Sequence, residues 1–384
     1  MGERTKKESN VPNLRFKEFE GEWESKTINE LGNFLGGGTP SSVNSNFWNG
    51  EIPWISSSDL DENDIHTVRI TRFINEEAIR NSSTKLCIAP VILIVSRVGV
   101  GKVAYSTKSL CTSQDFTNIV NLKCNGSFLS YLLSVVMRKA GSNTQGTSIK
   151  GIPSNEIKSK TVYIPEDGEQ QKIASFLSLL DDRISTQSKI ITQLETLMQG
   201  LNEQLLNQQI RFKDDNRNDF PDWKEKRIGE ILSIGNGKDY RHLASGKIPV
   251  FGTGGLMTHV DSFLYDGETV CIGRKGTIDN PMYFEGKIWT VDTLFYTHSF
   301  IDVIPKFIFF VFKSINWKEH NEASGVPSLS KSTLERIIIT LPSVEEQFLI
   351  TGLLTTIDER IDIEKEILEQ YQNQKKYLLQ NMFI

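Results

Sequence analysis

Two stretches of the chain carry apolar residues at alternating spacings of four and three. The first begins at Ile173 and the second at Ile350. A 3.5-residue repeat held this long indicates a left-handed coiled-coil seam rather than an ordinary amphipathic helix. The predicted seam residues are Ile173, Leu177, Leu180, Ile184, Ile191, Leu194, Met198 and Leu201 in the first helix, and Ile350, Leu354, Ile357, Ile361, Leu368 and Leu378 in the second.

Each predicted helix would expose a long apolar stripe, so each needs a partner. The other helix is the simplest partner, and the polar residues Gln187 and Glu364 fall at matching seam positions, where they would help to fix the register. Each helix follows its own globular segment. Antiparallel pairing would therefore put the two segments at opposite ends of a rod, whereas parallel pairing would crowd them at one end. We favour the antiparallel arrangement, and the alternative is a helix pair that merely holds two domains together.

The rest of the chain alternates short apolar runs with clusters of Gly, Pro, Ser and Asn, a pattern typical of strand-rich α+β domains. The run at 91–95 has a counterpart at 269–272, and helical patches are predicted near 128–139 and 306–314. Long polar loops on a small scaffold are the usual place for molecular recognition.

These patterns belong to an internal repeat. Arg97 and Arg274 lie 177 residues apart, as do many residues of the two helices, whereas Trp23 and Trp223 lie 200 apart. The first copy therefore carries 23 extra residues between about 32 and 90. A duplicated globular unit, each copy followed by a long helix, is the main organisation of the chain.

The sequence thus predicts an α+β chain with two strand-rich domains separated by a long antiparallel two-helix coiled coil, in a pseudo-twofold internal repeat. The predicted segments are an N-terminal tail at 1–13, domains at 14–164 and 212–341, and spacer helices at 165–211 and 342–384.

Charge is distributed unevenly around the net value of −5. The helical segments carry 5 basic against 9 acidic residues (165–215) and 4 against 8 (345–384), whereas 14–164 carries 16 against 14. A DNA-binding face on the globular domains is therefore permitted. No apolar stretch is long enough to span a membrane, and four cysteines without CxxC spacing suggest reduced thiols in the cytoplasm.

No catalytic constellation, metal site or cofactor site is predicted. The five histidines lack metal-ligand spacing. Gly99-Val100-Gly101-Lys102 lacks the leading glycine and the hydroxyl residue of a phosphate-binding loop. Asn280-Pro281-Met282-Tyr283 is one residue short of the Asn-Pro-Pro-Tyr loop of adenine methyltransferases, and a chance turn explains it better than base flipping does.

Several loop residues suit contact with DNA. Arg97 and Arg274 each follow an apolar strand and precede a nearby glycine, so either guanidinium could reach a phosphate or a guanine. The structural alternative is an ion pair with Asp115 or Asp292. The candidate contacts are Thr39, Ser41, Ser57, Ser58, Arg97, Lys102, Gln145, Ser148 and Lys150 in the first copy, and Lys238, Arg241, His242, Thr253, Arg274, Lys275, Ser324, Ser328 and Lys331 in the second.

Together these features resemble the specificity subunit of type I restriction–modification systems. The resemblance covers essentially the whole chain and depends on the order of its motifs. These are Pro12-Asn13-Leu14-Arg15-Phe16, Gly37-Gly38-Thr39-Pro40-Ser41, Phe47-Trp48-Asn49-Gly50, Glu169-Gln170 with Asp181-Asp182-Arg183-Ile184, and Glu346-Gln347 with Asp358-Glu359-Arg360-Ile361. The second copy departs from the pattern, because it lacks a clear counterpart of the Gly-Gly-Thr-Pro-Ser segment.

The resemblance implies two target-recognition domains, each recognising half of a bipartite site in double-stranded DNA, with the helices as spacers. It also implies two modification (methyltransferase) subunits and ATP-dependent restriction subunits as partners, with no catalysis by this chain. Two other functions stay open: a duplicated coiled-coil scaffold that binds proteins, and a self-contained adenine methyltransferase.

Overall fold

The computed structural model describes residues 10–142 and 151–384. The chain divides into unit 1, Met1–Gln187 with Ile367–Ile384, and unit 2, Ser188–Glu366. Both long helices contribute to both units: α4 (Asp167–Leu206) and α8 (Val344–Asn381). Each unit is described by itself below.

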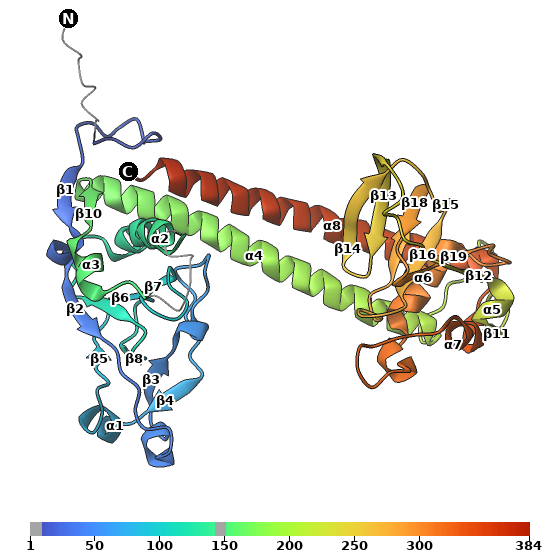
Figure 1. The fold of residues 1–384 in the computed structure, drawn as a ribbon, viewed down its shortest axis with the longest axis horizontal. Helices are drawn as coiled ribbons and strands as arrows, with labels where there is room; N and C mark the ends of the chain where they lie inside the picture. The colour runs from blue at the N-terminus through green and yellow to red at the C-terminus, as the bar shows by residue number, and fades with distance from the viewer. Residues whose placement is uncertain (1–9, 143–150) are drawn as a thin grey trace, which may run out of the picture. The chain divides into compact units, whose positions relative to one another are not determined.

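Unit 1 contains two four-stranded sheets and a two-stranded ribbon (Figure 1). The first sheet has the order β2 (Asn33–Gly36), β9 (Thr117–Val120), β6 (Val91–Ile94), β7 (Val103–Ser106). The second has the order β4 (Arg72–Ile74), β3 (Ile52–Ile55), β8 (Leu110–Thr112), β5 (Leu86–Cys87). The ribbon pairs β1 (Glu24–Thr27) with β10 (Thr161–Ile164). The shorter helices are α1 (Glu76–Arg80), α2 (Gly126–Ser142) and α3 (Ser154–Ser159), with 3-10 turns at Ile28–Leu31, Ser45–Trp48 and Ser57–Asp59.

Unit 2 repeats this topology strand for strand. Its first sheet has the order β12 (Ser233–Asn236), β19 (Leu294–His298), β16 (Thr269–Gly273), β17 (Met282–Phe284). Its second has the order β14 (Gly255–Val260), β13 (Ser245–Gly252), β18 (Lys287–Thr290), β15 (Tyr265–Asp266). The ribbon pairs β11 (Lys224–Arg227) with β20 (Ile338–Leu341). The shorter helices are α5 (Ile228–Ile231), α6 (Pro305–Ser314) and α7 (Lys331–Arg336), with a 3-10 turn at Trp317–His320.

Each unit buries an apolar helix beside its first sheet. Asn125 immediately precedes α2. Its side chain accepts a hydrogen bond from the Phe128 amide at 2.9 Å and so satisfies an otherwise unpaired donor of the first turn. The α6 helix begins with Pro305, whose fixed φ and missing N–H suit a first helical position. Their side chains join the main core of each unit, from Phe128 to Leu133 in unit 1 and from Phe307 to Phe312 in unit 2. The predicted helical patches are confirmed.

Repeated Glu-Gln pairs join each globular part to its long helix. Arg15 donates two hydrogen bonds to the buried Glu169 carboxylate, at 2.8 and 2.7 Å. Arg211 does the same to Glu346 at 3.1 and 2.9 Å. Such two-pronged contacts to a carboxylate fix orientation as well as adding energy.

The glutamine that follows each glutamate makes the second connection. The Gln170 side chain donates to the Pro165 carbonyl at 2.8 Å and accepts from the Asn125 amide at 2.9 Å. Gln347 donates to the Pro342 carbonyl at 3.1 Å and accepts from the Ile304 amide at 2.9 Å. Each glutamine thus ties the start of a long helix to the start of the apolar helix of its unit.

Within each unit, α4 and α8 lie side by side with opposite chain directions (Figure 1). In unit 1, Tyr371 shares a surface hollow with Gln187, whereas Lys375, further along α8, pairs with Asp181, earlier on α4. In unit 2, Lys365 pairs with Glu195 at 2.8 Å. The predicted antiparallel direction of the helix pair is therefore confirmed within each unit.

The predicted seam residues face the cores to differing degrees. In unit 1, Ile173, Leu177, Leu180 and Leu378 are buried, whereas Ile184 and Leu368 are partly buried. In unit 2, Ile191, Met198, Ile350, Leu354 and Ile361 are buried, whereas Leu194, Leu201 and Ile357 are partly buried. Polar residues also lie in this interface, because Gln187, Glu364 and Lys375 are all buried.

Candidate nucleic-acid interface

Unit 2 brings together loops that are far apart in the sequence. The Lys238 amide donates to the Thr290 carbonyl at 2.8 Å, and the Lys238 carbonyl accepts from the Trp289 indole at 2.8 Å. These bonds fix the backbone, and the side chains of Lys238, Arg241 and His242 remain exposed. The His242 ring lies edge-on to Trp289, with centroids 5.9 Å apart.

The β13–β14 hairpin borders the same loops. Gly252 pairs with Gly255 across a two-residue turn that contains Thr253. Gly255 has a φ of +106°, which glycine adopts without strain. A hollow of about 460 Å³ is lined by this turn, by Asp239–Arg241 and by Val291–Thr293. The Thr253 hydroxyl therefore lies beside the Arg241 loop.

The Arg274–Gly276 turn completes the cluster. A Cβ built on Gly276 would lie 3.6 Å from the Thr253 hydroxyl, so the hairpin and this turn are neighbours. Lys275 forms a β-bridge with Ser328, and the Gly276 amide donates to the Pro327 carbonyl at 2.9 Å. Lys275 and Ser324 are exposed, and Ser328 is partly exposed.

The remaining candidates of unit 2 have partners. The Arg274 guanidinium lies 5.8 Å from the centre of the Phe295 ring. Lys331 forms an exposed ion pair with Glu335 at 3.6 Å. His298, which is not one of the predicted contacts, lies near Lys331: burial lowers the pKa of this imidazole, and Lys331 lowers it further.

Unit 1 places its candidates on the equivalent loops. Arg97 is exposed, and a Cβ on Gly99 would lie 3.8 Å from the Ser57 side chain. Ser57 is partly exposed, and Ser58, which hydrogen-bonds Ser56, is exposed. The Lys102 ammonium donates to the carbonyls of Ser57 and Leu60 at 3.3 and 2.9 Å, so it holds this loop in place.

The glycine-rich segment of unit 1 is also exposed in part. Thr39 hydrogen-bonds Gln114, and the Ser41 carbonyl accepts from the Trp48 indole at 3.1 Å. Both hydroxyl residues are exposed. Gln145, Ser148 and Lys150 lie outside the described residues.

The structural alternative for the two arginines finds no support in the described parts of the chain. No ion pair there joins Arg97 to Asp115 or Arg274 to Asp292. Asp115 instead accepts from the Ser113 hydroxyl at 3.2 Å. The Arg97 guanidinium is therefore available to a ligand, whereas that of Arg274 lies against an aromatic ring.

Sequence reasoning missed Arg72, which organises the loop next to Ser57. Its guanidinium lies 4.6 Å from the centre of the Trp54 ring, pairs with Asp59 and donates to the Ser56 hydroxyl at 2.7 Å. Only its position after a polar loop could have suggested this role.

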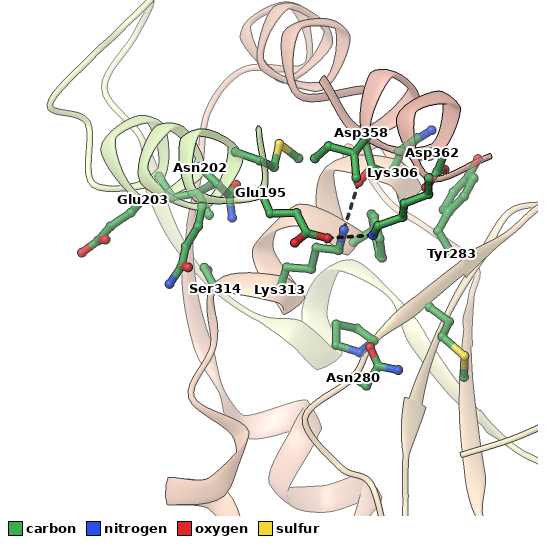
Figure 2. A pocket seen from close by; sticks show the side chains of 18 of the residues that line it. Glu195, Asn202, Glu203, Asn280, Tyr283, Lys306, Lys313, Ser314, Asp358 and Asp362 are labelled. Atoms are coloured by element: carbon green, nitrogen blue, oxygen red, sulfur yellow. Dashed lines mark hydrogen bonds and ion pairs between the residues drawn. The ribbon is translucent and has the colours of Figure 1, made fainter. Parts of the chain in front are cut away.

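The Asn-Pro-Met-Tyr segment lies elsewhere in unit 2. Asn280 to Tyr283 line a groove of about 920 Å³ together with α4, α6 and α8 (Figure 2). The Tyr283 hydroxyl donates to Glu268, and the Lys306 ammonium lies 5.1 Å from the centre of the Tyr283 ring. Since the tyrosine ring already packs against other side chains, it is not an open stacking platform for a base.

No group of three or more His, Cys, Asp or Glu side chains in the described residues could hold a metal ion. All four cysteines are free thiols. Among the helices of the described residues, none is long and apolar enough to cross a bilayer.

Comparison with known proteins gives the family. A model described as the type I restriction modification DNA specificity domain matches residues 20–196 and again 221–373. The chain belongs to this family. The double match coincides with the two topologically equivalent sets of sheets, so each carries one specificity domain.

The individual proteins to which this chain is similar are also specificity subunits. The MjaIX specificity subunit of Methanocaldococcus jannaschii is 31% identical over 57% of the chain and 53% of the relative's length. The EcoprrI specificity subunit of Escherichia coli is 24% identical over 86% of each protein. Among solved structures, the type I S subunit from M. genitalium has a TM-score of 0.66 at 18% identity, covering 97% of this chain and 99% of the other.

Proposed function

We propose that this chain is the sequence-specific DNA-recognition subunit of a type I restriction–modification complex. Unit 1 recognises one half of a bipartite site in double-stranded DNA, and unit 2 recognises the other half. Two modification subunits and ATP-dependent restriction subunits of the complex supply methylation and cleavage, in the cytoplasm, and this chain catalyses neither.

One observation carries the proposal: one sheet framework occurs twice and holds two different sets of exposed polar loops. Unit 2 places Arg241 and Thr253 around one hollow, with the exposed Lys238 next to its lining residue Asp239 and Lys275 next to Gly276, whose Cβ would lie 3.6 Å from the Thr253 hydroxyl. Unit 1 places the turn that follows the exposed Arg97 beside Ser57, because a Cβ on Gly99 would lie 3.8 Å from the Ser57 side chain. Cationic and hydroxyl side chains suit phosphate contacts and base edges alike, and different loops on equal frames suit two unlike half-sites.

The first test is binding of duplex DNA by the complex of the full chain with its modification subunit. The complex should bind DNA that contains the sequence it methylates, and this affinity should fall steeply as the salt concentration rises, because phosphate contacts release counterions. Binding that is insensitive to salt, or equal for DNA without the site, would contradict the proposal and favour a protein-binding scaffold.

The second test addresses catalysis. Titration calorimetry of the isolated chain with S-adenosylmethionine should give no binding heat, whereas the complex with the modification subunit should bind. Binding by the isolated chain would favour the self-contained methyltransferase instead.

A further inference from the structure

Unit 1 contains a buried polar cluster where α8 meets α4. Asp181 and Lys375 are each 8% exposed and form an ion pair. The Tyr131 hydroxyl donates to the Asp181 carboxylate at 2.6 Å, and the His66 ring nitrogen lies 2.9 Å from that hydroxyl. Burial raises the pKa of Tyr131, and the nearby Asp181 raises it further, so the phenol keeps its proton and donates. We call these four residues the Lys375 cluster.

The cluster holds a loop of the globular part. The Lys375 ammonium donates to the Asn63 carbonyl at 2.5 Å. Two residues later, Ile65 is buried in the main core and its carbonyl accepts from the Tyr105 amide at 2.7 Å. Arg138 of α2 donates to the Glu62 carbonyl at 3.2 Å. The backbone and the side chains of the loop at 61–66 are therefore both held in place. Lys375 is the residue of α8 that hydrogen-bonds to this loop.

The other end of this loop leads directly to predicted DNA contacts. Ser57 and Ser58 lie just before it, and the Leu60 carbonyl accepts from Lys102, which also binds the Ser57 carbonyl. Asn63 lies five residues after Ser58 along the backbone, so a shift of the loop at Asn63 would be passed to Ser57 and Ser58 through this short stretch. Loop displacements of about 1 Å are enough to disturb a recognition geometry.

Unit 2 has no equivalent of this connection in its described residues. The positions equivalent to Asp181 and Lys375 are Asp358 and Met198. Asp358 pairs instead with Lys313 of α6 at 3.1 Å, and both Asp358 and Met198 line the open 920 Å³ groove (Figure 2). The loop at 61–66 belongs to the stretch that holds the extra residues of the first copy. Asp181 is thus repeated as Asp358, but its pairing with Lys375 and the contact of Lys375 with the loop are not part of the repeated framework.

We propose that Lys375 is a positioning residue for DNA recognition by unit 1. This inference rests on the proposed function, and it makes recognition of one half-site depend on a residue near the end of α8. Lys375 does not touch DNA in this account. It holds Asn63, and through the loop it sets the place of Ser57 and Ser58.

A buried ion pair is a costly way to hold two helices together, because both charges lose water. Apolar residues of similar volume would often do so as well or better. The directional bond from Lys375 to a backbone carbonyl is what an apolar residue cannot supply. Positioning of the loop therefore explains the lysine better than helix pairing does.

The test uses the complex of the full chain with its modification subunit and measures methylation of DNA altered in either half-site. Lys375→Met should lower discrimination about tenfold, equivalent to about 1.4 kcal/mol, at the half-site that responds to Arg97→Ala. Discrimination at the half-site that responds to Lys275→Ala should be unchanged. Lys375→Arg keeps a donor and should restore most of the loss. The matched control is Lys365→Met, which removes an exposed α8 ion pair in unit 2 and should alter neither half.

Equal loss at both half-sites, or no loss at either, would overturn the inference and leave Lys375 a structural role only. If Lys375→Met does not fold, the double variant with Asp181→Asn removes both charges, and the same half-selective loss is expected from it. A failure of the proposed function is distinguishable, because Arg97→Ala and Lys275→Ala would then leave DNA discrimination intact at both half-sites.

Discussion

The two units share their framework and differ in what fills it. The contacts that recur lie at the N-terminal ends of the long helices, where Glu169 and Glu346 each bind an arginine through two hydrogen bonds. The contacts that differ lie in the loops and in the corner beside α4 and α8. In unit 1 that corner is covered by the loop at 61–66, whereas in unit 2 it is an open groove. The duplicated part thus attaches each domain to its helix, and under the proposed function the loops that differ determine what each domain recognises.

Loss of one of the recurring contacts should lower the unfolding free energy more than any other change considered below. Glu169→Ala and Glu346→Ala should each cost about 3 kcal/mol of unfolding free energy, because each leaves an arginine without its buried partner. Hydrogen exchange should show faster opening of unit 1 for the first variant and of unit 2 for the second. The exposed Glu345→Ala should change the unfolding free energy by less than about 0.5 kcal/mol. An equal loss of unfolding free energy for Glu345→Ala would show that the buried contacts of Glu169 and Glu346 do not account for the loss.

The next prediction concerns the helices that both units share. Inserting seven residues after Leu194 in α4 and seven before Lys365 in α8 keeps the apolar repeat and lengthens each helix by about 10 Å. We expect the methylated site to keep both half-sites and to gain about three base pairs of spacer. An unchanged spacer would refute the idea that helix length sets it.

A smaller effect is expected from single loop cations. Lys275→Ala should weaken binding to DNA that contains the recognised site about tenfold, because the proposed function assigns this lysine to base edges of one half-site, and should weaken binding to DNA without the site much less. The matched control is Lys224→Ala, an exposed lysine of β11 outside the predicted contact loops. The loss should be confined to Lys275, and similar losses for both variants would indicate a nonspecific charge effect.

The last prediction is the rate at which the cysteine thiols are alkylated. Burial raises the pKa of Cys87 to about 11 and that of Cys124 to about 11, so at pH 8 almost no reactive thiolate is present. Alkylation of the native chain should be slow at all three cysteines of unit 1 and at Cys271, the one cysteine that the sequence gives unit 2. During urea unfolding, the order of labelling would show whether the two units open together or separately. Rapid labelling of the native chain would contradict the raised pKa values of these thiols.

The sequence predicted the repeated framework well because that framework depends on local signals. Apolar spacing predicted α4 and α8, and the repeated Glu-Gln pairs marked where these helices begin. The direction of the helix pair could also be argued, because each helix follows its own domain. These features depend on residues close in the chain or on a period that can be counted.

The candidate site was harder to predict because its geometry depends on loops. Nothing in the sequence near Lys102 shows that its ammonium binds two carbonyls of the loop after Ser57. Arg72 could not be linked to Trp54 without the β3–β4 pairing. Lys375 did leave a signal, since a lysine falls on the apolar seam, but its partner Asn63 lies 312 residues away. The placement of Arg274 against Phe295 is a packing detail of the same kind.

If each unit recognises one half of a split DNA site, the sites that the complex methylates must themselves be split. The most direct measurement is sequencing of methylated sites in cells that contain this chain and its modification subunit, compared with cells that contain the Lys275→Ala variant. We expect two short blocks of specified bases separated by an unspecified spacer of fixed length, with relaxed bases in one block for the variant. A single uninterrupted motif, or equal relaxation of both blocks, would contradict it.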